Sequence, residues 1–187
     1  LGGSVTTSGF TLNEGTVSVA ANTLTASSVA VGDGAGTVAD LTVTTGAVTT
    51  SGGLTVTGTD GDYTPGTGTL TFNGAGNWAG PVAENYGTVV VTSAGVAPQN
   101  ALNTGSLTIT GVTLTLGVGN NLVTTGISGT GTLDATGAVN VTTSGGLTVG
   151  SYTAGAGTLT FSGDGNWSGG GNFGAVQINN TFTVTAL

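Results

Sequence analysis

The sequence predicts an all-β protein built as a β-solenoid, in which short strands coil around one long core. Thr and Gly dominate the 187 residues, with 40 and 38 copies, whereas Lys, Arg and Met are absent. Residues that favour helices are therefore scarce. Short runs in which apolar residues alternate with Thr fit strands with one buried face. Long segments of the chain also recur, as expected for stacked repeats.

The recurrence is clearest in two segments. Residues 49–56 (TTSGGLTV) recur without change as residues 142–149. Residues 68–78 (GTLTFNGAGNW) recur with two substitutions as residues 157–167 (GTLTFSGDGNW). Recurrence over this length indicates one structural unit used more than once.

A further match near the start divides the chain. Residues 4–15 (SVTTSGFTLNEG) resemble residues 106–117 (SLTITGVTLTLG). We therefore expect two sequence-related copies, residues 1–105 and 106–187, within one continuous domain. The offset between matching segments falls toward the end of the chain, so the second copy has shorter connections.

The apolar–Thr runs, such as residues 54–56 and 70–72, are short. Strands of three to five residues bury one face and need stacked neighbours to complete a core. With about 20 residues per turn, the chain would make on the order of nine turns. The alternative is a pair of β-sandwich modules, one for each copy.

The charge of the chain limits the classes of molecule that we expect it to bind. Eight acidic residues and no Lys, Arg or His give a formal net charge of −8. Phosphate groups need basic partners, so we expect neither nucleic acid nor an anionic membrane surface to bind. No apolar run approaches the roughly 18–20 residues of a transmembrane helix. The chain starts at Leu1 without a signal peptide, so we expect a removed leader or a longer parent chain.

The two ends of the sequence resemble the two halves of an internal junction. Residues 174–187 joined to residues 1–15 form a 29-residue stretch that resembles the 31 residues 87–117. Exposed solenoid ends are templates for further strand pairing. We therefore expect head-to-tail contact between copies of the chain, or one period of a longer repetitive chain. The expected assembly residues are Val5, Phe10, Leu12, Val176, Ile178, Phe182 and Val184.

Several segments resemble repeats of large bacterial surface proteins. They are residues 66–78 (GTGTLTFNGAGNW), residues 51–56 and 144–149 (SGGLTV), and residues 128–137 (SGTGTLDATG). The pattern is similar to filamentous-haemagglutinin and autotransporter-adhesin repeats. That resemblance implies a right-handed parallel β-helix, secretion to the cell surface, and a role in adhesion or in a surface layer. It carries over no catalytic residue.

Candidate chemistry is limited by the residues present. Without His, Cys or Lys, the common nucleophile and Schiff-base systems cannot be built, and we expect no enzyme and no cofactor. Asp60 and Asp62 are the only close carboxylate pair, and they are weak candidates for Ca²⁺, which needs six to eight oxygen ligands. Solvated turn positions explain these two residues better.

The aromatic residues recur in matching positions of the two copies. Phe72 matches Phe161, and Trp78 matches Trp167. Equivalent positions favour a repeated packing role over a ligand site. Exposed Trp is nevertheless typical of carbohydrate binding, which keeps cell-surface polysaccharide as a possible partner.

Three functions are therefore compared. The first is a structural subunit of an extracellular filament, sheath or fibre, which predicts complementary ends and assembly without a cofactor. The second is a stalk segment of a large secreted adhesin. The third is a carbohydrate-binding module, which predicts an exposed tryptophan in a groove with Asp60 or Asp62 beside it.

Overall fold

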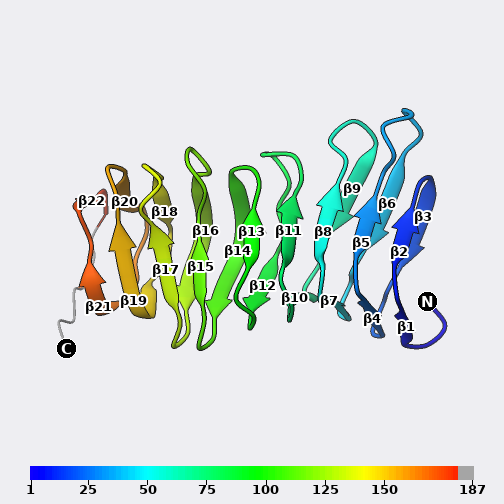
Figure 1. Cartoon of the computed structure of the whole chain (residues 1–187), viewed down its shortest axis with the longest axis horizontal. Coiled ribbons are helices and arrows are strands. Elements are labelled where there is room, and N and C mark those ends of the chain that lie inside the picture. The colour runs from blue at the N-terminus through cyan, green and yellow to red at the C-terminus, as the bar shows by residue number, and fades with distance from the viewer. Residues whose placement is uncertain (181–187) are drawn as a thin grey trace.

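The computed structural model describes residues 1–180 as a β-solenoid of about nine turns. All strand pairs in this part of the chain are parallel, and it contains no helix. The turns lie side by side along one long axis, with β1 near one end and β22 at the other (Figure 1). The predicted all-β solenoid is confirmed, and the alternative of two β-sandwich modules is wrong because parallel neighbours in the sheets are successive turns.

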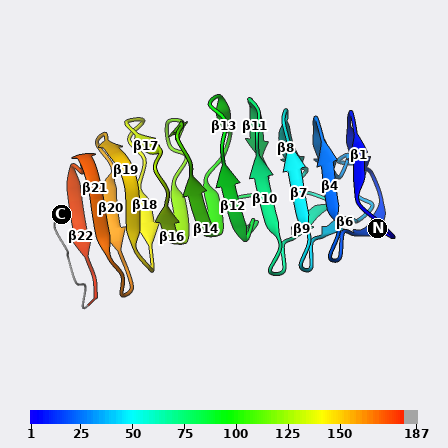
Figure 2. The same ribbon diagram turned by 90° about the horizontal axis from the view of Figure 1, so that it is seen from below.

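Each turn visits three sides of the solenoid, which we call side one, side two and side three. Side one begins with five strands and continues through parts of four longer ones. The strands are β1 (Val5–Thr7), β4 (Thr23–Ala26), β7 (Ala47–Thr50), β10 (Thr69–Phe72), β12 (Thr88–Val91), β14 (Leu102–Ile109), β16 (Leu122–Ser128), β19 (Leu147–Ala154) and β21 (Trp167–Asn172). Figure 2 shows these strands stacked in chain order.

Side two follows the same order along the axis. Its strands are β2 (Phe10–Leu12), β5 (Val29–Val31), β8 (Gly53–Val56), β11 (Gly76–Ala79), β13 (Val96–Pro98), β15 (Thr113–Thr115), β17 (Thr132–Ala135), the second part of β19, and β21 (Trp167–Asn172). The long strands β14, β16, β19 and β21 turn a corner and so contribute to two sides each, β21 through Trp167 and Ser168 on side one.

Side three carries the strands that complete each turn. They are β3 (Gly15–Ser18), β6 (Ala39–Thr42), β9 (Gly61–Thr64), the first parts of β14 and β16, β18 (Val141–Thr143), β20 (Thr158–Phe161) and β22 (Ala175–Ile178). One turn has no strand here. Residues 80–87 instead cross side three as a loop, joined to the next turn by an isolated bridge between Asn85 and Asn103.

The core is built by alternation along every short strand. In β10, for example, Leu70 and Phe72 are fully buried, whereas Thr69 and Thr71 are only half-buried. Stacking in register places apolar side chains of successive turns on one another. The longest such row runs along side one through Val5, Leu24, Val48, Leu70, Val89, Leu107, Ile127, Leu147 and Trp167. Burial of this row stabilises the fold, because hydrophobic free energy scales with the apolar area removed from water.

Buried threonines hold the corners between sides. The hydroxyl of Thr50 donates to the carbonyl of Gly53 at 2.9 Å and accepts from the Gly53 amide at 3.1 Å. Thr143 makes the corresponding bond to the carbonyl of Gly146 at 3.4 Å. A buried hydroxyl needs a hydrogen-bond partner, and here the partner is the backbone of a glycine in the bend. This explains why the TTSGG segment recurs.

The recurring segments do not occupy the same sides. Residues 49–56 form β7 on side one and β8 on side two, whereas residues 142–149 lie on sides three and one. Residues 68–78 and 157–167 differ in the same way. Along the chain, the second occurrence follows the first after four full turns and two further sides. Because two sides forward on a three-sided solenoid equal one side backward, the second occurrence is rotated about the axis by one side relative to the first.

Candidate functional site: the two ends of the solenoid

The N-terminal end is formed by β1, β2 and β3, which are paired on one edge only among the described residues. Their inward side chains pack on the second turn of the solenoid, but no preceding turn among the described residues packs on them. Val5 is 37 % exposed although it stands in the same row as the fully buried Leu24. Phe10 is half-buried, and Leu12 has 9 % of its surface exposed. Of the predicted N-terminal assembly residues, Val5 and Phe10 thus line an open end of the core, whereas Leu12 is already buried.

The C-terminal end is the last described turn, which includes β21 and β22. Val176 and Ile178 of β22 stand in register with the buried Leu159 and Phe161 of β20. Val176 is half-buried and Ile178 is 46 % exposed. The other two predicted assembly residues, Phe182 and Val184, lie outside the described residues.

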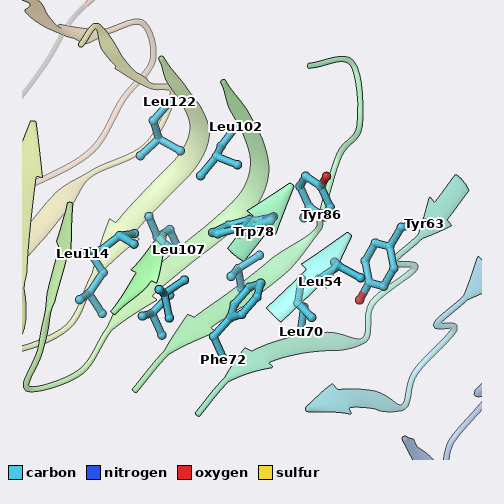
Figure 3. Close-up of a cluster of buried hydrophobic side chains, with 14 of the residues drawn as sticks. Leu54, Tyr63, Leu70, Phe72, Trp78, Tyr86, Leu102, Leu107, Leu114 and Leu122 are labelled. Atoms are coloured by element: carbon cyan, nitrogen blue, oxygen red, sulfur yellow. The ribbon is translucent and has the colours of Figure 1, made fainter. Parts of the chain in front are cut away.

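Two aromatic clusters occupy corresponding places in the sequence. In the first, the Trp78 ring centroid lies 4.9 Å from Phe72 and 5.3 Å from Tyr86, and Tyr86 lies 5.9 Å from Tyr63. These four side chains are almost completely buried in the middle of the solenoid. Figure 3 shows them packed among the leucines of neighbouring turns. Aromatic pairs at such separations add to the free energy gained by burial.

The second cluster lies at the C-terminal end. The Trp167 centroid is 5.4 Å from Phe161 and 4.8 Å from Phe173, and Phe173 stacks on Tyr152 at 5.4 Å. Phe161 and Tyr152 are buried, but Trp167 and Phe173 are only half-buried. The first cluster is therefore closed off from solvent in the middle of the solenoid, whereas its counterpart at this end is partly exposed to solvent.

Sequence reasoning paired Phe72 with Phe161 and Trp78 with Trp167, and Tyr86 has its counterpart in Phe173, but it missed Tyr63 and Tyr152. Tyr63 and Tyr152 complete the two clusters. The signal was present, because these tyrosines are separated by the same 89 residues as the two phenylalanines and the two tryptophans. It was hidden because their surrounding segments differ.

The structure gives the two aspartates proposed for Ca²⁺ separate partners. The carboxylate of Asp60 is 6 % exposed and accepts bonds from the amides of Asp33 at 3.2 Å and Gly34 at 2.9 Å. Burial alone would raise the pKa of Asp60, but these backbone bonds outweigh it and hold the pKa below its usual value. Asp60 therefore fastens the 33–36 loop, unlike the solvated position expected for it.

Asp62 is exposed and stands in register with Asp40 on the outer face of side three. Its carboxylate accepts from the hydroxyl of Thr64 at 3.5 Å, and the carboxyl of Glu84 lies next to it. In residues 1–180, no three His, Cys, Asp or Glu side chains form a group suited to a metal ion.

Burial raises the pKa of Glu84 into the neutral range, to about 7. The bond from the Tyr63 amide to Oε1 at 3.0 Å opposes this, and the charges of Asp62 and Asp40 add to it. The folded chain thus binds this proton more tightly than the unfolded chain does. Its contribution to stability is complete below about pH 4.5 and is lost as pH rises toward 7.

Replacing Glu84 with Gln should remove this dependence, because an amide oxygen can still accept from the Tyr63 amide but carries no charge. We expect E84Q to be more stable than the parent at pH 8 by on the order of 1 kcal/mol, since partial exposure screens the effect. Urea unfolding at pH 4.5, 6 and 8 measures the difference. The exposed Glu14→Gln variant is the control, and an equal gain there would attribute the effect to net charge alone.

Two further features of the described residues bear on the carbohydrate-binding alternative. A shallow hollow on side two is lined by Pro98, Gln99, Thr113, Thr115 and Asn120, without a carboxylate or an aromatic ring. Trp78 is fully buried, so it cannot stack on a sugar in a groove. Within residues 1–180, no helix could span a lipid bilayer.

Comparison of the chain with family models, with curated proteins and with solved structures finds no match.

Proposed function

We propose that the protein is a structural subunit of an extracellular filament, sheath or surface fibre, assembling head to tail through the ends of its solenoid. The observation that supports this is the state of the ends. At both of them, inward apolar side chains such as Val5 and Ile178 are exposed, although their row neighbours one turn away are fully buried. Natural β-proteins usually cover or charge such edges.

Contact between unlike ends favours a filament. The N-terminal edge of one copy and the C-terminal edge of another are different surfaces, so each added copy leaves a new edge of the same kind. A heterologous contact of this type extends indefinitely unless its geometry closes a ring. Parallel strands on all three sides would continue from copy to copy.

The extracellular setting and the right-handed coil rest on the resemblance to bacterial surface repeats, and they are proposed with it. Parallel crossover connections are also right-handed in about 98 % of cases. The carbohydrate-binding alternative is less well supported, because one of its two tryptophans, Trp78, is buried and Asp60 is engaged with the amides of Asp33 and Gly34.

Charged residues at the ends should prevent assembly. We expect the 187-residue chain at neutral pH to form long filaments of uniform width under negative-stain electron microscopy. Val5→Asp and Ile178→Asp should each abolish them, because either places an uncompensated charge in the joint. Sedimentation of the assembled fraction would give the extent of the loss.

The control is Val118→Asp, which places the same charge at a side chain that is 84 % exposed on the flank. It should leave filaments intact. Dispersed short rods from the parent chain would contradict the proposal and favour the stalk segment of a longer adhesin.

A further inference from the structure

The interior of the solenoid contains a template for the joint. Strand β12 pairs with residues 106–109 of β14 one turn later, with Val89 opposite Leu107 and Val91 opposite Ile109. All four side chains are fully buried. This is how the fold continues from one recurring segment into the next.

Both halves of that template recur at the ends. Residues 174–178 (GAVQI), which include β22, correspond to residues 87–91 (GTVVV), and residues 4–15, which include β1 and β2, correspond to residues 106–117. The outer edges of β22 and β1, which are unpaired among the described residues, therefore belong to segments that resemble two strands paired inside the molecule.

We propose that β1 of one copy pairs with β22 of the next copy in the register of β12 with β14; this proposal rests on the proposed filament. The register places Ser4 opposite Ala175, Val5 opposite Val176, Thr6 opposite Gln177, and Thr7 opposite Ile178.

Side-chain directions agree with this register. Val5 and Val176 both point inward, as shown by their row neighbours Leu24 and Leu159. They would reproduce the pair formed by Val89 and Leu107. A register displaced by one residue would place an inward valine against an outward polar residue, because strand side chains alternate in direction.

The partly open aromatic cluster supports the same joint. Phe173 directly precedes the β22 segment, as Tyr86 precedes β12. Tyr86 is sealed, with 1 % of its surface exposed, and its amide donates to the carbonyl of Asn103 in the following turn. A further turn stacked on β22 would give Phe173 the cover that Tyr86 already has.

The register has a geometric consequence. β22 lies on side three, whereas β1 lies on side one. Placing β1 on β22 therefore rotates each copy by one side relative to its neighbour, about a third of a turn, and the joint repeats as a helix instead of a ring. The same rotation separates the recurring segments within one chain.

The competing arrangement keeps the sides aligned. It stacks β1 on the side-one part of the last turn, with Val5 opposite Trp167 and Thr6 opposite Ser168. The two arrangements place the outward side chain of Thr6 beside different residues, Gln177 or Ser168, so disulfide formation can separate them.

The chain contains no cysteine, so every cross-link can be designed. Adjacent strands lie about 4.8 Å apart, within the Cα separation that a disulfide spans. We expect T6C/Q177C filaments, oxidised under mild conditions, to give a ladder of covalent multimers on a non-reducing gel that collapses with reductant. T6C/S168C and T6C/A175C should remain at least tenfold less linked, the latter because a two-residue displacement gives about 8 Å between Cα atoms. The single variants T6C and Q177C control for random collision.

Electron microscopy of the same samples distinguishes the two proposals. Filaments that cross-link through T6C/S168C, or that fail to cross-link through T6C/Q177C, would overturn the rotated register and leave the filament proposal standing. Dispersed rods without cross-links would overturn both.

Discussion

Replacing Trp78 with Ala should lower the free energy of unfolding by about 3–5 kcal/mol, the range found for large aromatic side chains deleted from a core. Trp78 is fully buried and lies within 5.3 Å of two other rings, those of Phe72 and Tyr86. It also stands between Leu54 and Pro98 in successive turns of side two. The cavity would therefore open at the middle of the stack, where neighbouring turns on both sides prevent collapse.

Trp167→Ala is the matched control, because this tryptophan has the same sequence context but is only half-buried at the end of the solenoid. We expect a smaller loss for it, about 1–2 kcal/mol, because less apolar surface is removed from the core. Guanidinium unfolding of dispersed chains, followed by circular dichroism, gives both values. Equal losses would show that the two clusters are equally sealed.

The second large effect is expected from Gly53→Ala. Gly53 has a φ of +112°, a conformation that side chains rarely adopt. A Cβ at this position would meet the backbone of Asn77 in the next turn, with the amide nitrogen at 2.7 Å and the carbonyl oxygen closer still. Because that backbone is part of the ladder between β8 and β11, it cannot withdraw without breaking hydrogen bonds. We expect a loss of about 2–4 kcal/mol.

Gly36→Ala separates the two causes. Gly36 has a φ of +86°, but a Cβ there would have no atom within 4 Å. Its loss should therefore be only about 1 kcal/mol, the cost of the left-handed conformation alone. The difference in unfolding midpoint between the two variants measures the close approach of successive turns. Equal midpoints would mean that backbone conformation alone explains both variants.

Local pattern was enough to predict the fold class. Alternation in segments such as residues 70–72 specifies which face of a strand is buried, and a short strand with one buried face needs a stacked neighbour. The recurrence of TTSGG likewise has a local cause, since Thr50 and Thr143 bond to the glycines of their own corners. The handedness and the division into two copies stay predictions.

The candidate ends were only partly accessible to sequence reasoning. The match between residues 174–178 and 87–91 indicated two halves of a junction, but it did not indicate on which side of the solenoid each half lies. The side depends on the number of residues in each turn, and this number varies. On side one, residues in register in successive turns are 24 positions apart from Leu24 to Val48 but 18 positions apart from Val89 to Leu107.

By itself, then, the sequence determined that the chain is all-β and stacks in about nine turns. Only the tertiary structure decided that the recurring segments are rotated by one side, that Asp60 fastens a loop through the amides of Asp33 and Gly34, and that one aromatic cluster is sealed while its counterpart is open. The physical reason is range. Alternation and turn chemistry act between neighbours in the chain, whereas register and cover depend on residues about 20 positions apart that meet only when the turns are stacked.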